Sequence, residues 1–355
     1  MVFYSLKLKQ VLVIVLGFFS GFIQAQSSEL FEKEDLLEIT LSGSIAELLK
    51  DRSNEPQFKE LTMSYKDAGN KLITIPIKAK TRGHFRKQKG VCRYPPLLLN
   101  FSKDHSKNSI FDQQDKIKLV TPCKDEKYVV YEYLTYRLYN LISPKSFKAR
   151  LVKVVFDIAS AKSPPEPQYG ILLEEEEQMA KRNNSISVEG KIVRPEQTDP
   201  TDFLTMAVFE YMIGNTDWSV QYLQNVKLIS DESGALPTAV PYDFDHAGIV
   251  MAPYAKPAEE LLMSSIRERR YRGYCIQDMN QFTAVIEKFN ERKPEIYNLY
   301  TDNPLLDERY IRSTIKFLDD FYETINEPKR LKSEFQYPCD VNGTGNVVIK
   351  GMRKN

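Results

Sequence analysis

The sequence predicts an α+β fold in which a mainly antiparallel β half precedes a mainly helical half. Residues 71–80 (KLITIPIKAK) alternate apolar and polar side chains, as expected of a strand with one buried face. Residues 279–300 and 306–326 instead carry apolar side chains at helical spacing. With 355 residues, of which 42% are hydrophobic, the chain is large enough for two cores.

Each short strand expected in the N-terminal half is an apolar or alternating run bounded by turn residues. These strands cover residues 36–41, 58–65, 71–80, 95–101, 116–120, 147–158 and 169–173. A helix is expected over residues 126–141, where apolar side chains form one broad face, and it stops before Pro144. We place the end of this β-rich part, residues 26–175, where polar residues follow the last of these strands.

The C-terminal part, residues 176–340, is expected to begin with a helix and a hairpin. The helix covers residues 202–213, after the helix-start signal Asp199-Pro200. The hairpin strands, residues 225–230 and 238–244, flank a polar turn. Further helices are expected over residues 258–270, 279–300 and 306–326, with a bend in the second of them near Pro294 as one form it could take. From Pro328 the chain is expected to be basic and partly loose, with residues 341–355 as a tail.

The N-terminus has the pattern of an export signal. Lys7 and Lys9 precede an apolar run, residues 11–23, which is too short to span a bilayer comfortably, and Ala25 offers a cleavage position. We therefore expect a signal peptide over residues 1–25, cleavage near Ala25 and a periplasmic or extracellular protein. An uncleaved anchor is the alternative. No later run approaches membrane length, so no membrane span is expected after cleavage.

The four cysteines allow three disulfide pairings, and export permits disulfides. Cys92 and Cys123 lie in one half, and Cys275 and Cys339 in the other, so pairing within each half is favoured over four unpaired thiols. A zinc site is not expected, because no Cys-x-x-Cys spacing occurs and the histidines are scattered. Lys+Arg number 49 and Asp+Glu 48, which excludes a strong overall field for nucleic acid.

The candidate site residues gather between residues 210 and 248. Asp217 follows the apolar helix, Asn225 begins a strand, and Asp243 and Asp245 end the next one. Alternation along that strand would turn both carboxylates to one side. Acidic groups at the end of a buried strand are costly unless a cation or hydrogen-bond donors compensate them.

Together these residues suit phosphoryl transfer. Asp217 would accept the proton of an acceptor hydroxyl, Asn225 and Asp243 would hold Mg²⁺ on the phosphates, and Asp245 would hold a second ion. Taken singly, Asp217 is more simply a turn residue and Asn225 an ordinary strand residue.

Candidate phosphate and nucleotide contacts come from the N-terminal half. Arg82 lies beside Gly83 at a strand end, where a glycine lets backbone N–H groups approach an anion. Lys118 lies on a strand that precedes the helix bearing Glu132, a layout that orients lysines towards phosphates. Glu174 ends a strand and could point into a cleft. The alternatives are a solvated basic turn, a lysine on an edge strand and a solvated acidic run.

These blocks carry a family resemblance. The order of Arg82-Gly83, YGILLEEEE, GNTDW followed by Asn225, and PYDFDHAG resembles the CotH-like (spore coat protein H) atypical protein kinases, and more distantly HipA-type and lipid-kinase-like folds. The blocks RNN, IGNTDWS and PYDFD look like those of exported Bacteroidetes proteins. The resemblance spans roughly Lys71 to Gly248.

The resemblance implies a two-lobed protein-kinase-like fold and transfer of phosphate from ATP, with Mg²⁺, to a protein or another acceptor of the cell envelope. By motif position, Asp217 would be the catalytic aspartate, Asn225 and Asp243 metal ligands, and Glu174 a nucleotide-pocket residue. Family members place lysines after the arginine–glycine loop, where this chain has RYPPL, so Lys118 is a candidate that the motif does not assign.

Two other functions fit the same residues. In the first, the protein is a catalytically inactive kinase-fold binding or structural protein of the envelope, whose acidic pair binds Ca²⁺ or is satisfied by arginines. In the second, a pair of carboxylates hydrolyses glycosidic bonds, although nothing in the sequence identifies a sugar cleft.

Overall fold

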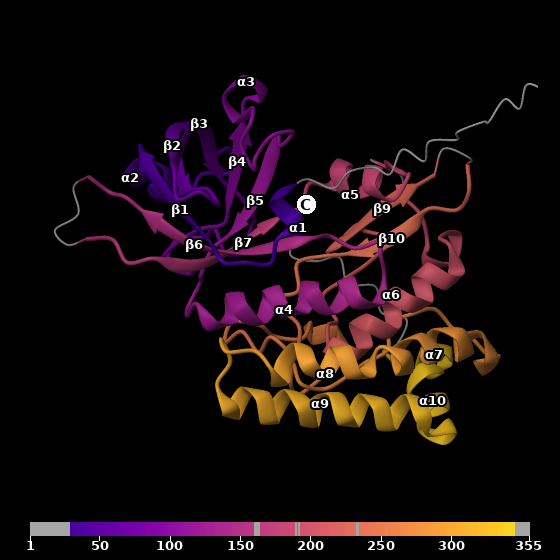
Figure 1. Cartoon of the computed structure of the whole chain (residues 1–355). Helices are drawn as coiled ribbons and strands as arrows, with labels where there is room; N and C mark the ends of the chain where they lie inside the picture. The colour runs from indigo at the N-terminus through magenta and orange to yellow at the C-terminus, as the bar shows by residue number, and fades with distance from the viewer. Residues whose placement is uncertain (1–28, 160–163, 189, 191, 232–233, 345–355) are drawn as a thin grey trace, which may run out of the picture.

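The structure, a computed structural model, describes residues 29–159, 164–188, 190, 192–231 and 234–344. It has both sheets and helices, which confirms the α+β class: a β-barrel lies against a layered helical half with its own small sheet (Figure 1). The predicted signal peptide, residues 1–25, and most of the predicted tail lie outside the described residues.

Within the described residues, the strands of the N-terminal half close into a barrel in the order β1-β2-β3-β4-β5-β7-β6. Neighbouring strands are antiparallel except β1 and β6, which are parallel and close the barrel. The sequence predicted a mainly antiparallel N-terminal half, but not that its strands close into a barrel. The strands are β1 (Leu37–Gly43), β2 (Lys59–Lys66), β3 (Leu72–Thr81), β4 (Leu97–Phe101), β5 (Lys116–Val120), β6 (Ala149–Phe156) and β7 (Gln168–Leu173).

The barrel interior follows from alternation. In β3, Ile75, Ile77 and Ala79 are buried, whereas Pro76 and Lys78 between them are exposed. The buried residues join a cluster of aliphatic and aromatic side chains from the other strands. Short helices cover the barrel and its connections: α1 (Glu29–Glu32), α2 (Ile45–Lys50) and α3 (Lys103–Ser106).

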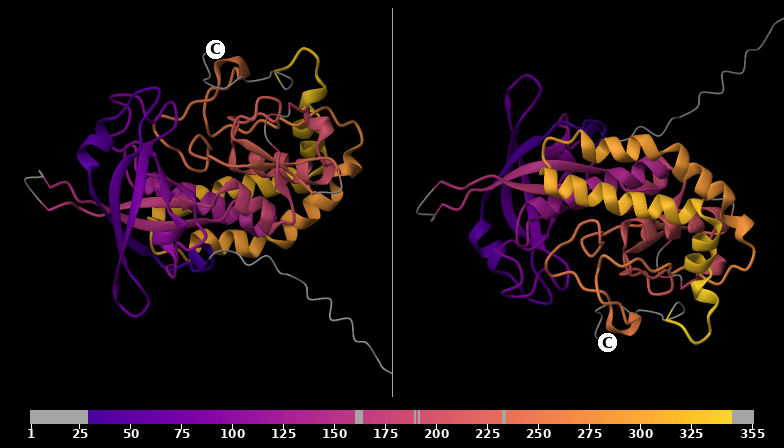
Figure 2. Two further views of the ribbon diagram at one scale, coloured as in Figure 1. Left: turned by 90° about the horizontal axis from the view of Figure 1, so that it is seen from above. Right: turned by 90° about the horizontal axis from the view of Figure 1, so that it is seen from below.

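The helical half is built in layers around one large apolar cluster. The helix α4 packs against β6 and β7 on one side and against α8 on the other, and α8 and α9 lie side by side (Figures 1 and 2). The cluster includes α4 although it precedes residue 175, so the domain boundary near that residue stays a prediction. The longer helices are α4 (Lys127–Ile142), α6 (Pro200–Ile213), α7 (Thr283–Glu291), α8 (Lys293–Thr301), α9 (Glu308–Asn326) and α10 (Pro328–Phe335).

A small antiparallel sheet next to α6 carries the predicted hairpin. Its strand order is β10-β9-β8, with α5 packed beside β8 and β9. Gly214 ends α6 with a left-handed φ of 67°, and a Cβ there would lie 3.0 Å from Phe317, so glycine is required both by conformation and by space. The elements are α5 (Glu176–Arg182), β8 (Ile186–Ser187), β9 (Val226–Ser230) and β10 (Thr238–Pro241).

Two expectations for the helical segments of the C-terminal half are wrong. Residues 258–270 form no long helix but a single 3₁₀ turn, Glu259–Leu261, followed by an irregular segment. The side chains of Arg267 and Arg269 explain this, because they donate to carbonyl oxygens of other segments: Arg267 to Gly248, and Arg269 to Met212.

The helix expected over residues 279–300, with a bend near Pro294, is divided there. A 3₁₀ turn, Met279–Phe282, is followed by α7 and α8, which meet at Arg292 just before Pro294. The other wrong expectation concerns the segment after α9. The chain after Pro328 is not loose but forms α10, whose Phe335 is buried.

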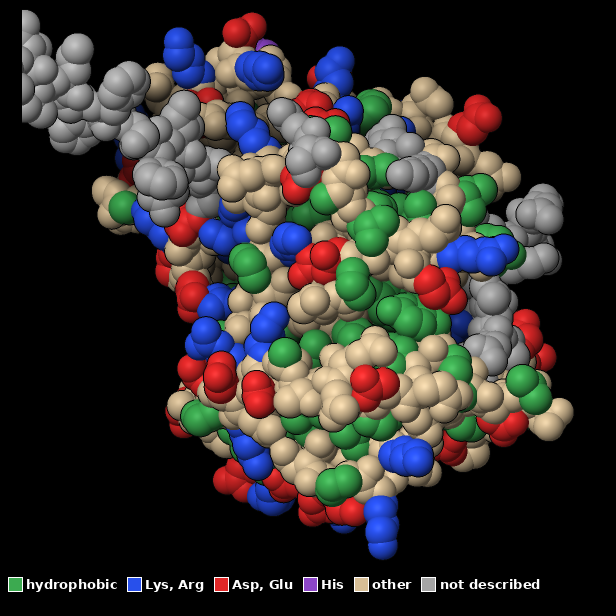
Figure 3. All heavy atoms as spheres, turned by 90° about the vertical axis from the view of Figure 1, so that its right-hand side faces the viewer, with side chains coloured by type: hydrophobic (Ala, Val, Ile, Leu, Met, Phe, Trp, Pro, Cys, Tyr) green, Lys and Arg blue, Asp and Glu red, His purple; other side chains and the backbone are tan. Residues whose placement is uncertain are grey.

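Both favoured disulfides are present. Cys92–Cys123 joins the β3–β4 connection to the β5–α4 connection, and Cys275–Cys339 joins the segment before α7 to the segment after α10. Across residues 29–344, as far as they are described, no helix combines the length and apolarity needed to cross a membrane. Acidic and basic side chains are interspersed on the face drawn in Figure 3, in keeping with the balanced charge of the chain.

The Cys92–Cys123 bond encloses a loop with a sequence separation of 31 residues. Such a bond restricts the unfolded chain, so replacing both cysteines by serine should lower the free energy of unfolding by about 3–4 kcal/mol. Denaturant unfolding under oxidising conditions measures this loss. The control is to add a reductant to the serine variant, because the reductant can then break only the Cys275–Cys339 bond. An unchanged free energy of unfolding would contradict the assignment of the bond.

Candidate functional site

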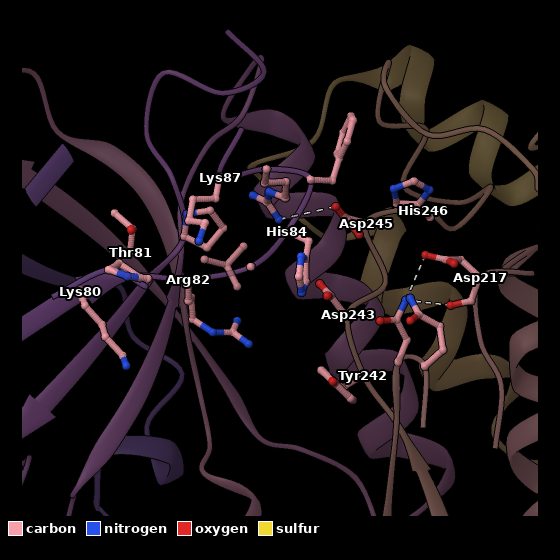
Figure 4. Close-up of a pocket in the computed structure, with 18 of the residues that line it drawn as sticks. Lys80, Thr81, Arg82, His84, Lys87, Asp217, Tyr242, Asp243, Asp245 and His246 are labelled. Carbon is pink, nitrogen blue, oxygen red and sulfur yellow. Dashed lines mark hydrogen bonds and ion pairs between the residues drawn. The ribbon is translucent and has the colours of Figure 1, made fainter. Parts of the chain in front are cut away.

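A cavity of about 490 Å³ lies between the barrel and the small sheet (Figure 4). This volume lies in the range of small-molecule sites. Its two walls differ in charge. The barrel side presents the cationic side chains of Lys80, Arg82, Arg86 and Lys87, and the opposite side presents carboxylates and a histidine: Asp217, Asp243, Asp245 and His246.

The cationic wall comes from the end of β3 and the connection that follows it. Gly83 has a φ of 82° and no atom within 4 Å of the position of a Cβ, so it turns the chain without filling the cavity. The backbone N–H of Arg82 donates to Pro96 O at 2.9 Å, which ties this turn to the residue just before β4. Arg82 therefore lines the cavity, as its sequence position suggested, and its role as a phosphate contact stays a prediction.

Asp217 and Asn225 are brought together by a narrow hairpin. Ser219 and Gln224 exchange two backbone hydrogen bonds of 2.9 Å, which places the residues just outside them side by side. The Nδ2 of Asn225 donates to the backbone O of Asp217 at 2.7 Å and to its Oδ2 at 3.1 Å. The structure thus joins two of the predicted site residues directly.

Hydrogen bonds from the backbone of Asp217 and from Arg272 hold the loop that carries Asp217. The N–H of Asp217 donates to Asn215 Oδ1 at 3.1 Å, and the guanidinium of Arg272 donates to the carbonyl oxygens of Thr216 and Trp218 on either side. Burial raises the pKa of Asp217, and Asp243 raises it further, while His246 and Arg272 act in the opposite direction. The single tryptophan is buried under the loop, as packing predicts.

Asp243 reaches the cavity by a route that the sequence did not predict. The expected strand over residues 238–244 is wrong at its end, since β10 stops at Pro241. Asp243 has a left-handed φ of 65°, and its N–H donates to Tyr136 Oη on α4 at 2.9 Å. A non-glycine residue held in this conformation is a recurrent feature of functional sites. Strand alternation therefore does not explain why Asp243 and Asp245 share the cavity.

The side chain of Phe244 anchors this turn in the core. It is fully buried, with its ring centroid 4.8 Å from that of Tyr136 and 5.5 Å from that of Phe209. Burial raises the pKa of Asp243, as does neighbouring Asp245, whereas Arg86 lowers it.

Asp245 lies in a buried ionic group. Its Oδ2 accepts a hydrogen bond from Tyr254 Oη at 2.9 Å and lies 3.7 Å from Arg86 Nη1. The same Nη1 lies 3.6 Å from Glu132 Oε2. Lys118 was the cation expected near Glu132, but the cation that faces this carboxylate is Arg86.

The remaining two candidates lie outside the lining of the cavity. Lys118 lies on β5 with its Nζ 4.6 Å from the ring centroid of Tyr242, whose side chain does line the cavity. Burial, with Arg82 and Lys227 nearby, lowers the pKa of Lys118 to about 7. Glu174 is buried and paired with Arg182 at 2.9 Å, and it is not among the described residues that border the cavity.

Sequence reasoning missed three residues of the site. Arg86 belongs to the same RGHFR segment as Arg82, and the second arginine of that segment was the available signal. Tyr136 is one helical turn after Glu132, so both project from one face of α4. Tyr254 lies in an irregular segment, and no local pattern identifies it.

The site can be tested for its fit to a metal ion. No group of three or more His, Cys, Asp or Glu side chains that could hold an ion occurs in the described part of the chain. Mg²⁺ on a nucleotide needs only one or two protein ligands, because phosphate oxygens and water complete its shell. Asn225 uses Nδ2 on Asp217, which leaves its Oδ1 for an ion beside the Asp243 carboxylate. These residues therefore fit a nucleotide-bound Mg²⁺ and do not form a cage for a free ion.

Neither a protein-family model nor a curated protein sequence matches the chain significantly. Among solved structures, the crystal structure of a Helicobacter pylori proinflammatory kinase, CtkA, aligns with 71% of this chain and 95% of that chain, at 12% identity and a TM-score of 0.41. A similarity at this level decides neither topology nor activity, so the function has to be argued from the site.

Lys118 should make stability depend on pH. Its pKa near 7 in the folded protein contrasts with about 10.4 for an unfolded chain, so the unfolded state binds more protons between these values and the fold gains stability as pH rises. Relative to Lys118→Met, the wild-type free energy of unfolding should gain on the order of 2 kcal/mol between pH 6 and pH 9. Denaturant unfolding at both pH values measures it.

Lys116→Met is the matched control, because Lys116 is an exposed lysine on the same strand. If both substitutions change the pH dependence equally, Lys118 is not the group responsible.

Proposed function

We propose that the cavity binds a magnesium–nucleotide complex, with ATP as the nucleotide, and transfers its terminal phosphoryl group to a hydroxyl of a protein or another envelope acceptor. The observation that carries the proposal is the division of charge across the cavity, with cations on the barrel side and the fixed Asp217–Asn225 pair beside Asp243 on the other. Such a division suits a polyphosphate on one side and its cation on the other. The motif order that resembles CotH-like kinases supports a two-lobed, kinase-like arrangement.

Asp217 is the proposed base. Asn225 holds its carboxylate and Arg272 holds the loop carbonyls beside it, so the aspartate is oriented before an acceptor arrives. The raised pKa of Asp217 makes its carboxylate a better acceptor for the hydroxyl proton at neutral pH.

Asn225 Oδ1 and the Asp243 carboxylate are the proposed ligands of Mg²⁺, which when bound would neutralise charge on the transferred phosphoryl group. The left-handed turn at Asp243 presents this carboxylate to the cavity while Phe244 stays in the core. The tie between the Asp243 N–H and Tyr136 keeps the turn in place.

Arg82 and Lys118 are the proposed phosphate contacts. Arg82 lines the cavity directly, and Lys118 lies behind Tyr242. A lysine with a pKa near 7 gains a proton when an anion approaches, because the new negative charge favours the ammonium form. Glu174, whose carboxylate is held by Arg182, has no proposed part in the nucleotide pocket.

An inactive, ligand-binding protein is the second candidate. The observation that favours it is the pairing of Asp245 with Arg86 and Tyr254, since arginines that satisfy the acidic residues would leave fewer ligands for ions. Export to the periplasm or beyond is part of both proposals, and the two disulfides are compatible with it.

The proposed function predicts metal-dependent nucleotide binding. Wild-type protein with Mg²⁺ and the non-hydrolysable analogue adenylyl imidodiphosphate should melt a few degrees higher than protein alone, because ligands stabilise the state that binds them. Asp243→Asn should lose most of this shift while keeping the turn, since asparagine also tolerates a positive φ. Thermal melting with and without Mg²⁺ measures both.

Asp104→Asn is the control, because Asp104 is an exposed carboxylate on α3 that does not line the cavity. Equal shifts in wild type and Asp243→Asn, or no shift in either, would end the proposal. Binding without phosphoryl transfer would favour the inactive candidate.

A further inference from the structure

More carboxylates lie at or near the cavity than one divalent ion needs as ligands. Glu132 and Asp245 lie 3.6 Å and 3.7 Å from the same Arg86 nitrogen, and Asp243 is two residues before Asp245. Glu132 and Asp245 are only 2% and 6% exposed. Two buried carboxyl groups at this depth must either be protonated or lie next to a cation, because an uncompensated buried charge is strongly unfavourable.

The guanidinium of Arg86 is already in that position. Its Nη1 lies 3.6 Å from Glu132 Oε2 and 3.7 Å from Asp245 Oδ2, so one nitrogen serves both carboxylates. Figure 4 shows this ion pair at Asp245 as a dashed line, on the barrel-facing side of the carboxylate. A cation that bridged the same two oxygens would have to occupy the same space.

Arg86 is also held in place by the barrel. Its Nη2 donates to the carbonyl oxygen of Thr121, two residues before Cys123, and Cys123 is bonded to Cys92 of the connection that carries Arg86. The side chain is 8% exposed. Because arginine stays protonated at all physiological pH values, this positive charge is permanent.

One oxygen of the Asp245 carboxylate already has two partners. Oδ2 faces Arg86 and also accepts the hydrogen bond from Tyr254 Oη at 2.9 Å. Asp243 and Asp245 both line the cavity, but of these two only Asp245 is paired with Arg86 and Tyr254 in the described part of the chain.

We infer that Arg86 replaces the second divalent cation, so that the site takes one ion, at Asn225 and Asp243, and Asp245 is not a metal ligand. The inference rests on the proposed function and narrows it to a phosphoryl-transfer site in which a protein side chain supplies the second positive charge. Arg86 thereby supplies one positive charge to Glu132 and Asp245 whether or not a nucleotide is bound.

Counting ions tests the inference directly. Equilibrium dialysis of the whole protein against Mn²⁺ and adenylyl imidodiphosphate gives the excess of each on the protein side. We expect one Mn²⁺ for each bound nucleotide. Two Mn²⁺ for each nucleotide would overturn the inference and leave the proposed function intact, whereas no bound nucleotide and no bound Mn²⁺ would remove both.

Variants separate the roles of the residues. Asp243→Asn should weaken Mn²⁺ binding at least about tenfold, and Asp245→Asn should change it by less than about threefold. Equal weakening by both would make Asp245 a ligand and overturn the inference.

Arg86→Gln should raise the ratio towards two Mn²⁺ for each nucleotide, because Glu132 and Asp245 then lack their cation. Arg93→Gln, at an exposed arginine of the same connection, should leave the ratio at one. A folded Arg86→Gln protein that still binds one Mn²⁺ would contradict the inference. If circular dichroism shows that this variant does not fold, the wild-type ratio and the two aspartate variants decide.

Discussion

The need to compensate buried carboxylates shapes the region where the barrel meets the helical half. Glu132 comes from α4, Asp245 from the turn after β10, and Arg86 from the connection after β3, so three separate segments meet at one charge group. Removing Arg86 would leave two carboxyl groups without their cation in a place that water hardly reaches. The ionic group therefore holds together the elements that form the two walls of the cavity.

Around that group, each wall of the cavity is positioned by features of short chain segments. Glycine at positive φ turns the basic connection, a two-bond hairpin joins Asp217 to Asn225, and a buried phenylalanine anchors the turn that carries Asp243. The helix α4 contacts residues of both walls: its Glu132 forms an ion pair with Arg86, and its Tyr136 accepts a hydrogen bond from the N–H of Asp243. The chemistry of the cavity thus depends on a helix that itself contributes no side chain to its lining among the described residues.

Local pattern predicted most elements, because alternation, helical spacing and turn residues are encoded over a few positions. Both disulfides were favoured for another reason, that each pair of cysteines lies within one half of the chain. β5 was predicted at its observed bounds, whereas the strand expected to reach residue 244 ends at Pro241. Residues 258–270 show the limit most clearly. Their helical spacing is real, but Arg267 and Arg269 gain more from carbonyl groups of distant segments. Barrel closure and the Arg86–Glu132 contact could not be predicted, since both join residues far apart in the chain.

The Asp217–Asn225 pair and the Arg86–Asp245 pair differ in how far apart their two residues lie along the chain. Asp217 and Asn225 are separated by eight residues and form their hydrogen bond within one hairpin. Arg86 reaches Asp245 only after the barrel has closed and docked on the small sheet. Contacts of long sequence separation cost more chain entropy to close than local ones. The aspartate–asparagine hydrogen bonds thus form within a single hairpin, whereas the Arg86 contacts exist only while the two halves of the molecule are joined.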